Sequence, residues 1–271
     1  MIIRIRNYQW PLGIKNEILQ FIDKEKINLC YISTAIYDLQ PTRSNVLTSM
    51  PQVVILAGGL GTRLGDIARE IPKSLVNVHG KPILTHILDW ARNQGCGEAL
   101  ILTGHLSDKF RKYSHNNMNL TFHEETEPLG TGGALWNAVN HLEDEFILLW
   151  GDDFHPIDYM PLVKHHRMSR APITMTVTES SHHFNLEHQD GKVVAYDKEI
   201  MRSNFNGYEA GTSMVDRSVV HNHGKDGKWS WEETVYPALS GKIHAHLDNT
   251  PFWDMGTPER LASLENFFKT R

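Results

Sequence analysis

The stretch that decides the fold is Val53–Lys73, VVILAGGLGTRLGDIAREIPK. It begins with apolar residues that predict a buried strand, and the glycines that follow let backbone N–H groups approach a phosphate or a base closely. Arg63 adds a rigid cationic fork on the same turn, and Lys73 adds a second positive charge. This combination predicts a loop that holds the phosphates of a nucleotide, so the expected substrate is a nucleoside triphosphate.

Two better-known glycine-rich loops do not fit this pattern. In a P-loop the lysine directly follows a glycine, whereas Lys73 follows Pro72. In a Rossmann fingerprint a third glycine stands where this chain has Leu64. A glycine turn that binds no ligand is the remaining alternative for a motif of this length.

Downstream of Gln52 the sequence alternates between apolar runs and amphipathic segments. Strands are expected at 53–57, 99–103, 120–124 and 146–150, and helices at 81–93, 106–115 and 131–142. This order predicts an α/β protein with a Rossmann-like, three-layer αβα fold and a mostly parallel central sheet. Ligands of such sheets bind beyond the carboxyl ends of the strands, and both the glycine loop and Asp152 fall there.

The second half of the chain has a different pattern. Strands are expected at 173–178, 208–215 and 242–247, a hairpin over 186–197 turning at Asp190-Gly191, and a helix over 258–268. His221-x-His223 and His244-x-His246 would each place two imidazoles on one face of a strand. Because no cysteine or acidic residue stands at a spacing that completes a zinc set, ordinary histidines are favoured over metal ligands.

Residues 1–51 differ in composition from the rest and predict a separate N-terminal extension of unknown role. A helix over 14–26 and a strand over 28–39 are expected there, followed by a polar linker with two prolines over 40–51. The second expected domain covers 52–271.

Composition excludes several classes of protein. The net charge of −5 argues against a general nucleic-acid binder. No apolar run approaches the length of a membrane span, and the first residues lack the apolar core of a signal peptide. The two cysteines, Cys30 and Cys96, form no disulfide framework, which fits a reducing compartment. We therefore expect a cytoplasmic protein without nucleic-acid or membrane partners, and a homo-oligomer remains open.

Four ordered segments together resemble the sugar-1-phosphate nucleotidyltransferases, or NDP-sugar pyrophosphorylases, over about residues 52–270. The first is the opening signature, which runs from the glycine loop through Pro72-Lys73 to Gly80-Lys81-Pro82-Ile83-Leu84. The others are a second nucleotide loop at 127–134, EPLGTGGA; a metal-binding Gly151-Asp152; and a C-terminal metal-binding segment at 253–259, WDMGTPE.

The resemblance implies a nucleotidyltransferase (GT-A-like) fold, with an NTP and a sugar 1-phosphate as substrates and Mg²⁺ as cofactor. It implies that Arg63 neutralises the leaving pyrophosphate, that Lys73 bridges the phosphates of both substrates, and that Asp152 and Asp254 bind the metal. The residues it implies for the nucleotide are Leu56, Ala57, Gly58, Gly59, Gly61, Thr62, Pro128, Gly130, Thr131 and Gly132.

The sugar side departs from the family pattern. Where the family has a Glu-Lys pair this chain has Asp197-Lys198, so Lys198 is expected to keep the contact with the sugar phosphate. Where the family has Asn-Ala-Gly or Asn-Gly-Gly, this chain has Glu209 and Gly211 around an alanine, which points to an altered acceptor. Ser230-x-x-Glu233 is interpreted as a helix capping box in preference to a substrate contact.

Within the family, the chain most resembles the guanylyltransferases that act on mannose or heptose 1-phosphate for cell-surface polysaccharides. Cytidylyl or uridylyl transfer to another phosphorylated acceptor, such as phosphocholine, stays an alternative because Glu209 could face a cationic head group. A non-catalytic nucleotide sensor is the other alternative. The presence of Arg63, Lys73 and both metal aspartates argues against it.

Overall fold

The computed structural model describes residues 49–61, 64, 67–181 and 183–270. Residues from Met50 onward form one unit. Two predicted site residues, Thr62 and Arg63, lie outside the described residues, as do nearly all of the expected N-terminal extension and its elements. The division of the chain at 51/52 stays a prediction.

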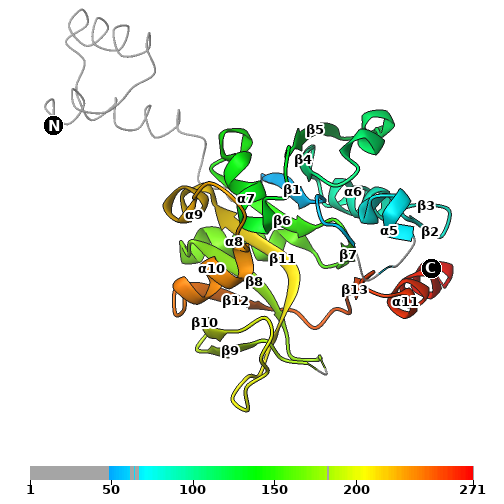
Figure 1. Cartoon of the computed structure of the whole chain (residues 1–271). Helices are drawn as coiled ribbons and strands as arrows, with labels where there is room; N and C mark the ends of the chain where they lie inside the picture. Colours follow the sequence, from blue (N-terminus) through cyan, green and yellow to red (C-terminus); the bar gives the residue numbers. More distant parts are fainter. Residues whose placement is uncertain (1–48, 62–63, 65–66, 182, 271) are drawn as a thin grey trace, which may run out of the picture. The chain divides into compact units, whose positions relative to one another are not determined.

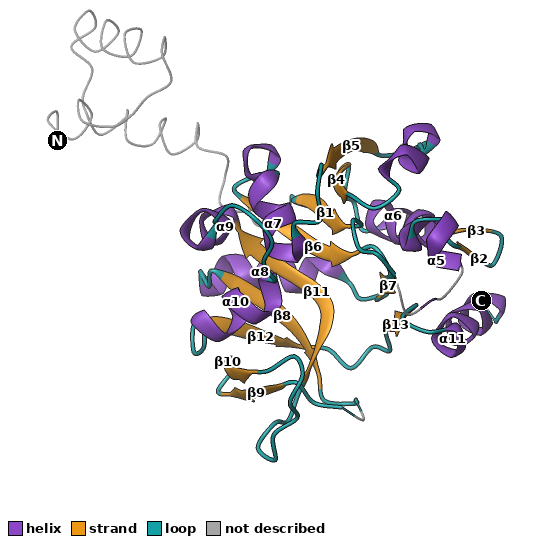
Figure 2. Ribbon diagram, in the orientation of Figure 1, coloured by secondary structure: helices purple, strands orange, loops and turns teal. Residues whose placement is uncertain are grey.

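A central sheet of nine strands runs through the described part of the chain (Figures 1 and 2). Its spatial order is β5-β4-β1-β6-β11-β8-β12-β10-β9. Its strands are β1 (Gln52–Leu56), β4 (Glu98–Thr103), β5 (Asn119–Glu124), β6 (Glu145–Trp150), β8 (Ile173–Thr178), β9 (Leu186–Gln189), β10 (Lys192–Tyr196), β11 (Tyr208–Asp216) and β12 (Ile243–Leu247). Two short ladders stand beside it: β2 (Asn77–Val78) with β3 (Lys81–Pro82), and β7 (Asp153–Phe154) with β13 (Trp253–Asp254).

The half of the sheet made by β5, β4, β1 and β6 is parallel, as the sequence predicts. The other half is mixed, because β11 runs antiparallel to both β6 and β8, whereas β12 runs parallel to β8. The hairpin of β9 and β10 closes the sheet at one edge. Its turn residues, Asp190 and Gly191, both have positive φ, of 51° and 72°, which explains the Asp-Gly sequence there.

Helices cover both faces of the sheet, which confirms the three-layer fold (Figure 2). One core lies under α7 (Gly130–Asn137), α9 (Arg217–His223) and α10 (Trp231–Ala238). The other lies under α6 (Ile83–Asn93), α8 (Tyr159–Ser169) and α11 (Pro258–Lys269). A short helix, α5 (Ile67–Glu70), follows the glycine loop. No helix among the described residues is both long and apolar enough to cross a membrane.

Three local predictions differ from the structure. The segment expected as a helix over 106–115 is a 3₁₀ helix at Ser107–Lys112. The helix expected over 131–142 ends at Asn137, and a 3₁₀ turn follows at Val139–His141. His221-x-His223 lies at the end of α9 and not on a strand, so its side chains do not share a face in the way predicted.

Candidate active site

Two parallel strands bring the glycine loop and Asp152 to the same edge of the sheet. Leu56 at the end of β1 is in register with Trp150 at the end of β6. The Gly151 N–H donates to the Leu56 carbonyl oxygen at 2.9 Å, which ties the two following turns together. The placement expected from strand polarity is therefore confirmed for these two segments.

A cavity of about 410 Å³ opens at this edge. It is lined by ten of the predicted site residues, from the glycine loop, the second nucleotide loop and the two charged positions: Leu56, Ala57, Gly58, Gly59, Gly61, Lys73, Pro128, Gly130, Thr131 and Asp152. Glu125 and Lys228 also line it, and the sequence analysis named neither. Segments that are far apart in sequence thus meet at one concave site.

The second nucleotide loop is fixed by contacts with the segment before α10. The Gly132 N–H donates to the Trp229 carbonyl oxygen at 3.0 Å. A Cβ atom on Gly132 would lie 2.1 Å from the ring of Trp229, so only glycine fits there. The structure thus gives Gly132 a packing role, and its contact with a nucleotide stays a prediction.

Three carboxylates gather beside the first cavity. Asp254 on β13 pairs with Asp153 on β7, the residue next to Asp152. The Met255 N–H donates to the Asp152 carbonyl oxygen at 3.1 Å, which holds the C-terminal segment against the turn after β6. The two aspartates predicted as metal ligands are thus brought near each other, Asp152 in the turn before β7 and Asp254 on β13, although about a hundred residues separate them in sequence.

The charges of this group fit a cation. Lys73 forms an ion pair with Asp152, and Arg260 lies 2.8 Å from Asp254. Burial, with the charges of Asp152 and Asp254, raises the pKa of Asp153 well above its usual range. Asp152 and Asp254 each carry a carboxylate that is paired with a cationic side chain, and carboxylate oxygens are the protein ligands that Mg²⁺ prefers. The predicted metal residues suit this ion.

The predicted sugar-phosphate residue Lys198 lines a second cavity, of about 540 Å³, together with Asp197, Asp254 and Arg260. Its ammonium group lies 2.7 Å from the carboxylate of Glu232. Glu232 thereby links the sugar side of the site to the nucleotide loop, because it also accepts a hydrogen bond from the Thr131 hydroxyl at 2.6 Å.

Glu232 is a further residue that the sequence reasoning missed. Ser230 does cap α10, accepting a hydrogen bond from the Glu233 N–H at 3.3 Å, so the serine half of the predicted capping box is confirmed. Glu232, one position earlier, points inward instead, and its side chain is only 7% exposed. The sequence feature that could have identified Glu232 is an acidic residue beside Trp231, which is buried, on the inward face of a capped helix.

Glu209 and Gly211 lie on β11, next to this network. A side-chain oxygen of Glu209 accepts a hydrogen bond from the Gly211 N–H at 2.9 Å. Gly211 has a φ of +77°, and a Cβ there would lie 3.1 Å from a carboxylate oxygen of Asp153. Gly211 is therefore required by backbone geometry, and the Glu209 side chain holds that geometry. Contact of either residue with a sugar stays a prediction.

Glu209 should make the stability of the protein depend on pH. Burial, and next the charge of Glu232, raises the pKa of Glu209 to about 7 in the folded state, against about 4.3 in an unfolded chain. Between these two pH values Glu209 binds its proton in the folded state but not in the unfolded state. The stabilising contribution of Glu209 to folding is therefore present at low pH and is lost as the pH rises towards 7.

The variant Glu209→Gln should lack this contribution. We expect the free energy of unfolding of the wild type to fall relative to that of the variant as the pH rises across about 4.5–7. Above that range the difference should level off. Urea denaturation at a series of pH values measures it. A difference that does not vary with pH would contradict the assignment.

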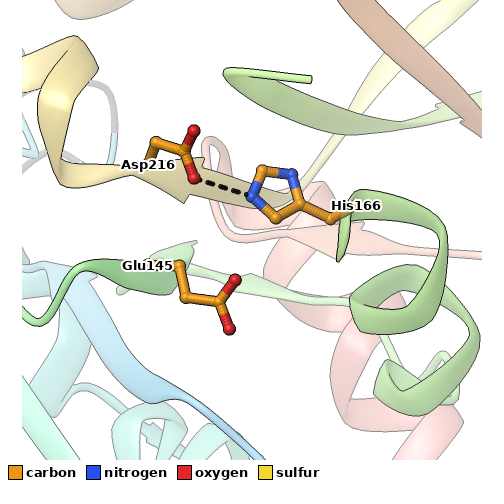
Figure 3. Close-up of side chains that lie close together, drawn as sticks. All are labelled: Glu145, His166 and Asp216. Carbon is orange, nitrogen blue, oxygen red and sulfur yellow. Dashed lines mark hydrogen bonds and ion pairs between the residues drawn. The ribbon is translucent and has the colours of Figure 1, made fainter. Parts of the chain in front are cut away.

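A separate cluster lies at the opposite end of the sheet, where Glu145, His166 and Asp216 place their ligand atoms within 4.8 Å of one another (Figure 3). The His166 ring is hydrogen-bonded through Nε2 to a carboxylate oxygen of Asp216 at 3.2 Å and through Nδ1 to the Thr174 hydroxyl at 3.0 Å. The guanidinium of Arg167 lies 2.5 Å from Glu145. Because both ring nitrogens of His166 already have partners in Asp216 and Thr174, we interpret the cluster as a hydrogen-bond and ion-pair network that anchors α8 to the sheet.

Comparisons with known proteins agree with the site. Residues 52–189 match the family model for nucleotidyl transferases. A D-glycero-alpha-D-manno-heptose 1-phosphate guanylyltransferase of Campylobacter jejuni is 28% identical over 221 residues, which cover 77% of this chain and 96% of the relative. A mannose-1-phosphate guanylyltransferase of Mycobacterium tuberculosis is 28% identical over 225 residues, covering 78% and 63% respectively.

Solved structures give the same result. HddC from Yersinia pseudotuberculosis, in a crystal structure complexed with GMP-PN, is 28% identical to this chain with a TM-score of 0.69. The alignment covers 81% of this chain and all of HddC. A putative glucose-1-phosphate thymidylyltransferase from Bacillus anthracis, at 18% identity and a TM-score of 0.71, shares the fold.

Proposed function

Because the chain belongs to the nucleotidyl transferase family, we propose that it makes an NDP-sugar and pyrophosphate from an NTP and a sugar 1-phosphate. GTP with heptose or mannose 1-phosphate is the proposed pair, because proteins with those names match the chain over most of its length. The proposal extends to Mg²⁺ as cofactor, to a cytoplasmic location and to a place in cell-surface polysaccharide synthesis.

The observation that carries the proposal is the convergence of two glycine-rich loops, Lys73 and Asp152 on one cavity. The loops provide small residues around a space for a nucleotide. Lys73 provides the positive charge that phosphates require, and Asp152 provides the negative charge that a metal ion requires. The second cavity is lined by Asp254 and Lys198, which leaves room for a second phosphorylated substrate.

The proposed reaction needs positioning and charge neutralisation more than proton transfer. A phosphate oxygen of the sugar 1-phosphate attacks the α-phosphorus of the NTP, and pyrophosphate leaves. That oxygen is largely ionised near pH 7, because the second pKa of a phosphate is about 6, so no general base is required. Lys73 and Arg63 would offset the negative charge, and Lys198, held by Glu232, would orient the sugar phosphate.

Asp152 and Asp254 would hold Mg²⁺ through carboxylate oxygens. The ion, when bound, draws negative charge from the phosphates of both substrates. The ion pairs with Lys73 and Arg260 show that both carboxylates already attract cations.

Glu125 supports guanine as the base. Its carboxylate lines the first cavity, and a Cβ on Gly58 would lie 3.1 Å from one of its oxygens, so it stands beside the first glycine of the loop. An ionised carboxylate accepts hydrogen bonds and donates none; one oxygen of Glu125 accepts from the Leu129 N–H at 3.3 Å, and the other is the oxygen beside Gly58. Guanine presents two adjacent N–H donors on its pairing edge, whereas uracil and thymine present a single N–H between two carbonyls.

The experiment that tests the proposed function is pyrophosphate release with Mg²⁺, across four NTPs and a panel of sugar 1-phosphates that includes mannose, heptose and glucose. Turnover with GTP and one of the first two sugars is expected. Turnover with CTP and phosphocholine instead would establish the alternative acceptor. If folded protein binds an NTP but turns over none of these pairs, the catalytic proposal is wrong.

The variant Glu125→Gln tests the choice of base. Hydrogen bonds to a charged group contribute about 1.5–3 kcal/mol, so we expect the ratio of kcat/KM for GTP to that for UTP to fall by about 10- to 100-fold. Glu124→Gln is the matched control, because Glu124 is the next residue along the chain and its carboxylate bonds Ser107 outside the cavity. An equal change in both variants would remove Glu125 from base recognition.

A further inference from the structure

Three histidines meet where α8 packs on β12, away from the proposed catalytic residues. His244 and His246 alternate along β12 with Ile243 and Ala245, which are buried in the core on the opposite face of the sheet. Because residues two apart on a strand share a face, both imidazoles point to the α8 side. His165 of α8 faces them, with ring centroids 5.7 Å from His244 and 5.6 Å from His246.

Two of these imidazoles already have the spacing of ligands on one metal ion. The Nδ1 atoms of His165 and His246 are hydrogen-bonded to each other at 3.3 Å, a contact that a metal ion would replace. Two nitrogens bound at about 2.0–2.1 Å to a tetrahedral zinc ion are about 3.3–3.4 Å apart, as the tetrahedral angle requires. His244 is partly exposed, and its ring would have to turn towards the pair to supply a third nitrogen.

The surroundings favour binding by neutral imidazoles. Burial lowers the pKa of His165, His244 and His246, and the neutral ring is the form that binds a metal. Thr176 is in register with His246 on the neighbouring strand, and its buried hydroxyl has no hydrogen-bond partner among the described residues. An unpaired hydroxyl at this position can bond a water on the metal.

We propose that His165, His244 and His246 bind a divalent transition-metal ion of the zinc class, with water completing the coordination. Nitrogen ligands select zinc, cobalt, nickel or copper over Mg²⁺, which prefers oxygen. The site is thereby chemically distinct from the carboxylates at the nucleotide cavity. A bound ion would cross-link α8 to β12 and stabilise the second half of the sheet.

The test is a titration of the full-length, EDTA-treated protein with Co²⁺ followed by visible absorption, and then displacement of Co²⁺ by Zn²⁺. We expect one ion with the absorption of a low-coordinate cobalt site, and no displacement of that ion by Mg²⁺. His246→Ala and His165→Ala should each weaken binding by at least about 10- to 100-fold, the loss seen when only an outer partner of a ligand is removed.

His221→Ala is the matched control, because His221 belongs to the other His-x-His segment, on α9. It should bind Co²⁺ as tightly as wild type. Histidine NMR spectra of the wild-type protein give a test without substitution: Co²⁺ should shift or broaden the signals of three of the sixteen histidines before the others. No binding at millimolar Co²⁺ would overturn the proposal, as would equal binding by His165→Ala, His246→Ala and His221→Ala. Both results are independent of the outcome of the Mg²⁺-dependent assay.

Discussion

Replacing Asp152 by asparagine is expected to lower kcat for the Mg²⁺-dependent reaction by about 10³-fold or more while the protein stays folded. Asparagine keeps the shape of the side chain but removes the charge that would hold the ion. Metal stabilisation of charge on a phosphoryl group contributes several kcal/mol to catalysis, and each 1.36 kcal/mol is a factor of ten in rate. Initial rates of pyrophosphate release at saturating substrates and a series of Mg²⁺ concentrations measure the effect.

The measurement needs a readout of metal binding beside turnover. Mn²⁺, which takes similar oxygen ligands, should bind the variant more weakly than wild type, and its bound fraction can be followed by electron paramagnetic resonance. Asp190→Asn is the control, because Asp190 is an exposed residue of the β9–β10 turn with a φ of 51°, a conformation that asparagine also tolerates. If Asp152→Asn kept a kcat within a few-fold of wild type, the metal assignment would be wrong.

The part of the fold nearest the nucleotide cavity could be predicted from local pattern. The runs at 53–57 and 146–150 are apolar throughout, and the run at 99–103 is apolar except for Thr103, because their strands are buried on both faces. Such runs are characteristic of parallel sheets. Strand polarity alone then placed the glycine loop and Asp152 at one edge. Long-range information was not needed for these predictions.

The parts that sequence could not give depend on contacts between distant segments. The Lys198–Glu232–Thr131 chain joins residues from three elements, and no spacing in the sequence encodes their meeting. The same holds for His165, which faces the His244-x-His246 pair only because α8 packs on β12. The helix expected over 131–142 was wrong at its end because asparagines at 137 and 140 are weak helix formers, which an apolar stripe does not reveal.

Replacing Lys73 by methionine is expected to lower kcat/KM by about 10²- to 10³-fold, the loss measured when one preorganised charge partner is removed from an active site. Methionine keeps most of the length of the side chain, which is only 13% exposed, so the packing around it is largely retained. The variant Lys73→Arg, which keeps the charge, should recover part of the rate. Steady-state kinetics with the productive substrate pair measure both variants.

Metal binding separates this role of Lys73 from general damage to the site. In the free protein Lys73 is ion-paired with Asp152, so it competes with a metal ion for the same carboxylate. Lys73→Met should therefore bind Mn²⁺ more tightly than wild type in the absence of substrates, although it turns over more slowly. A distorted site would lose both properties together. In the proposed mechanism Lys73 moves from Asp152 to the phosphates when the metal ion binds. Tighter Mn²⁺ binding with slower turnover in Lys73→Met is the result expected from it. Weaker Mn²⁺ binding by the variant would contradict it.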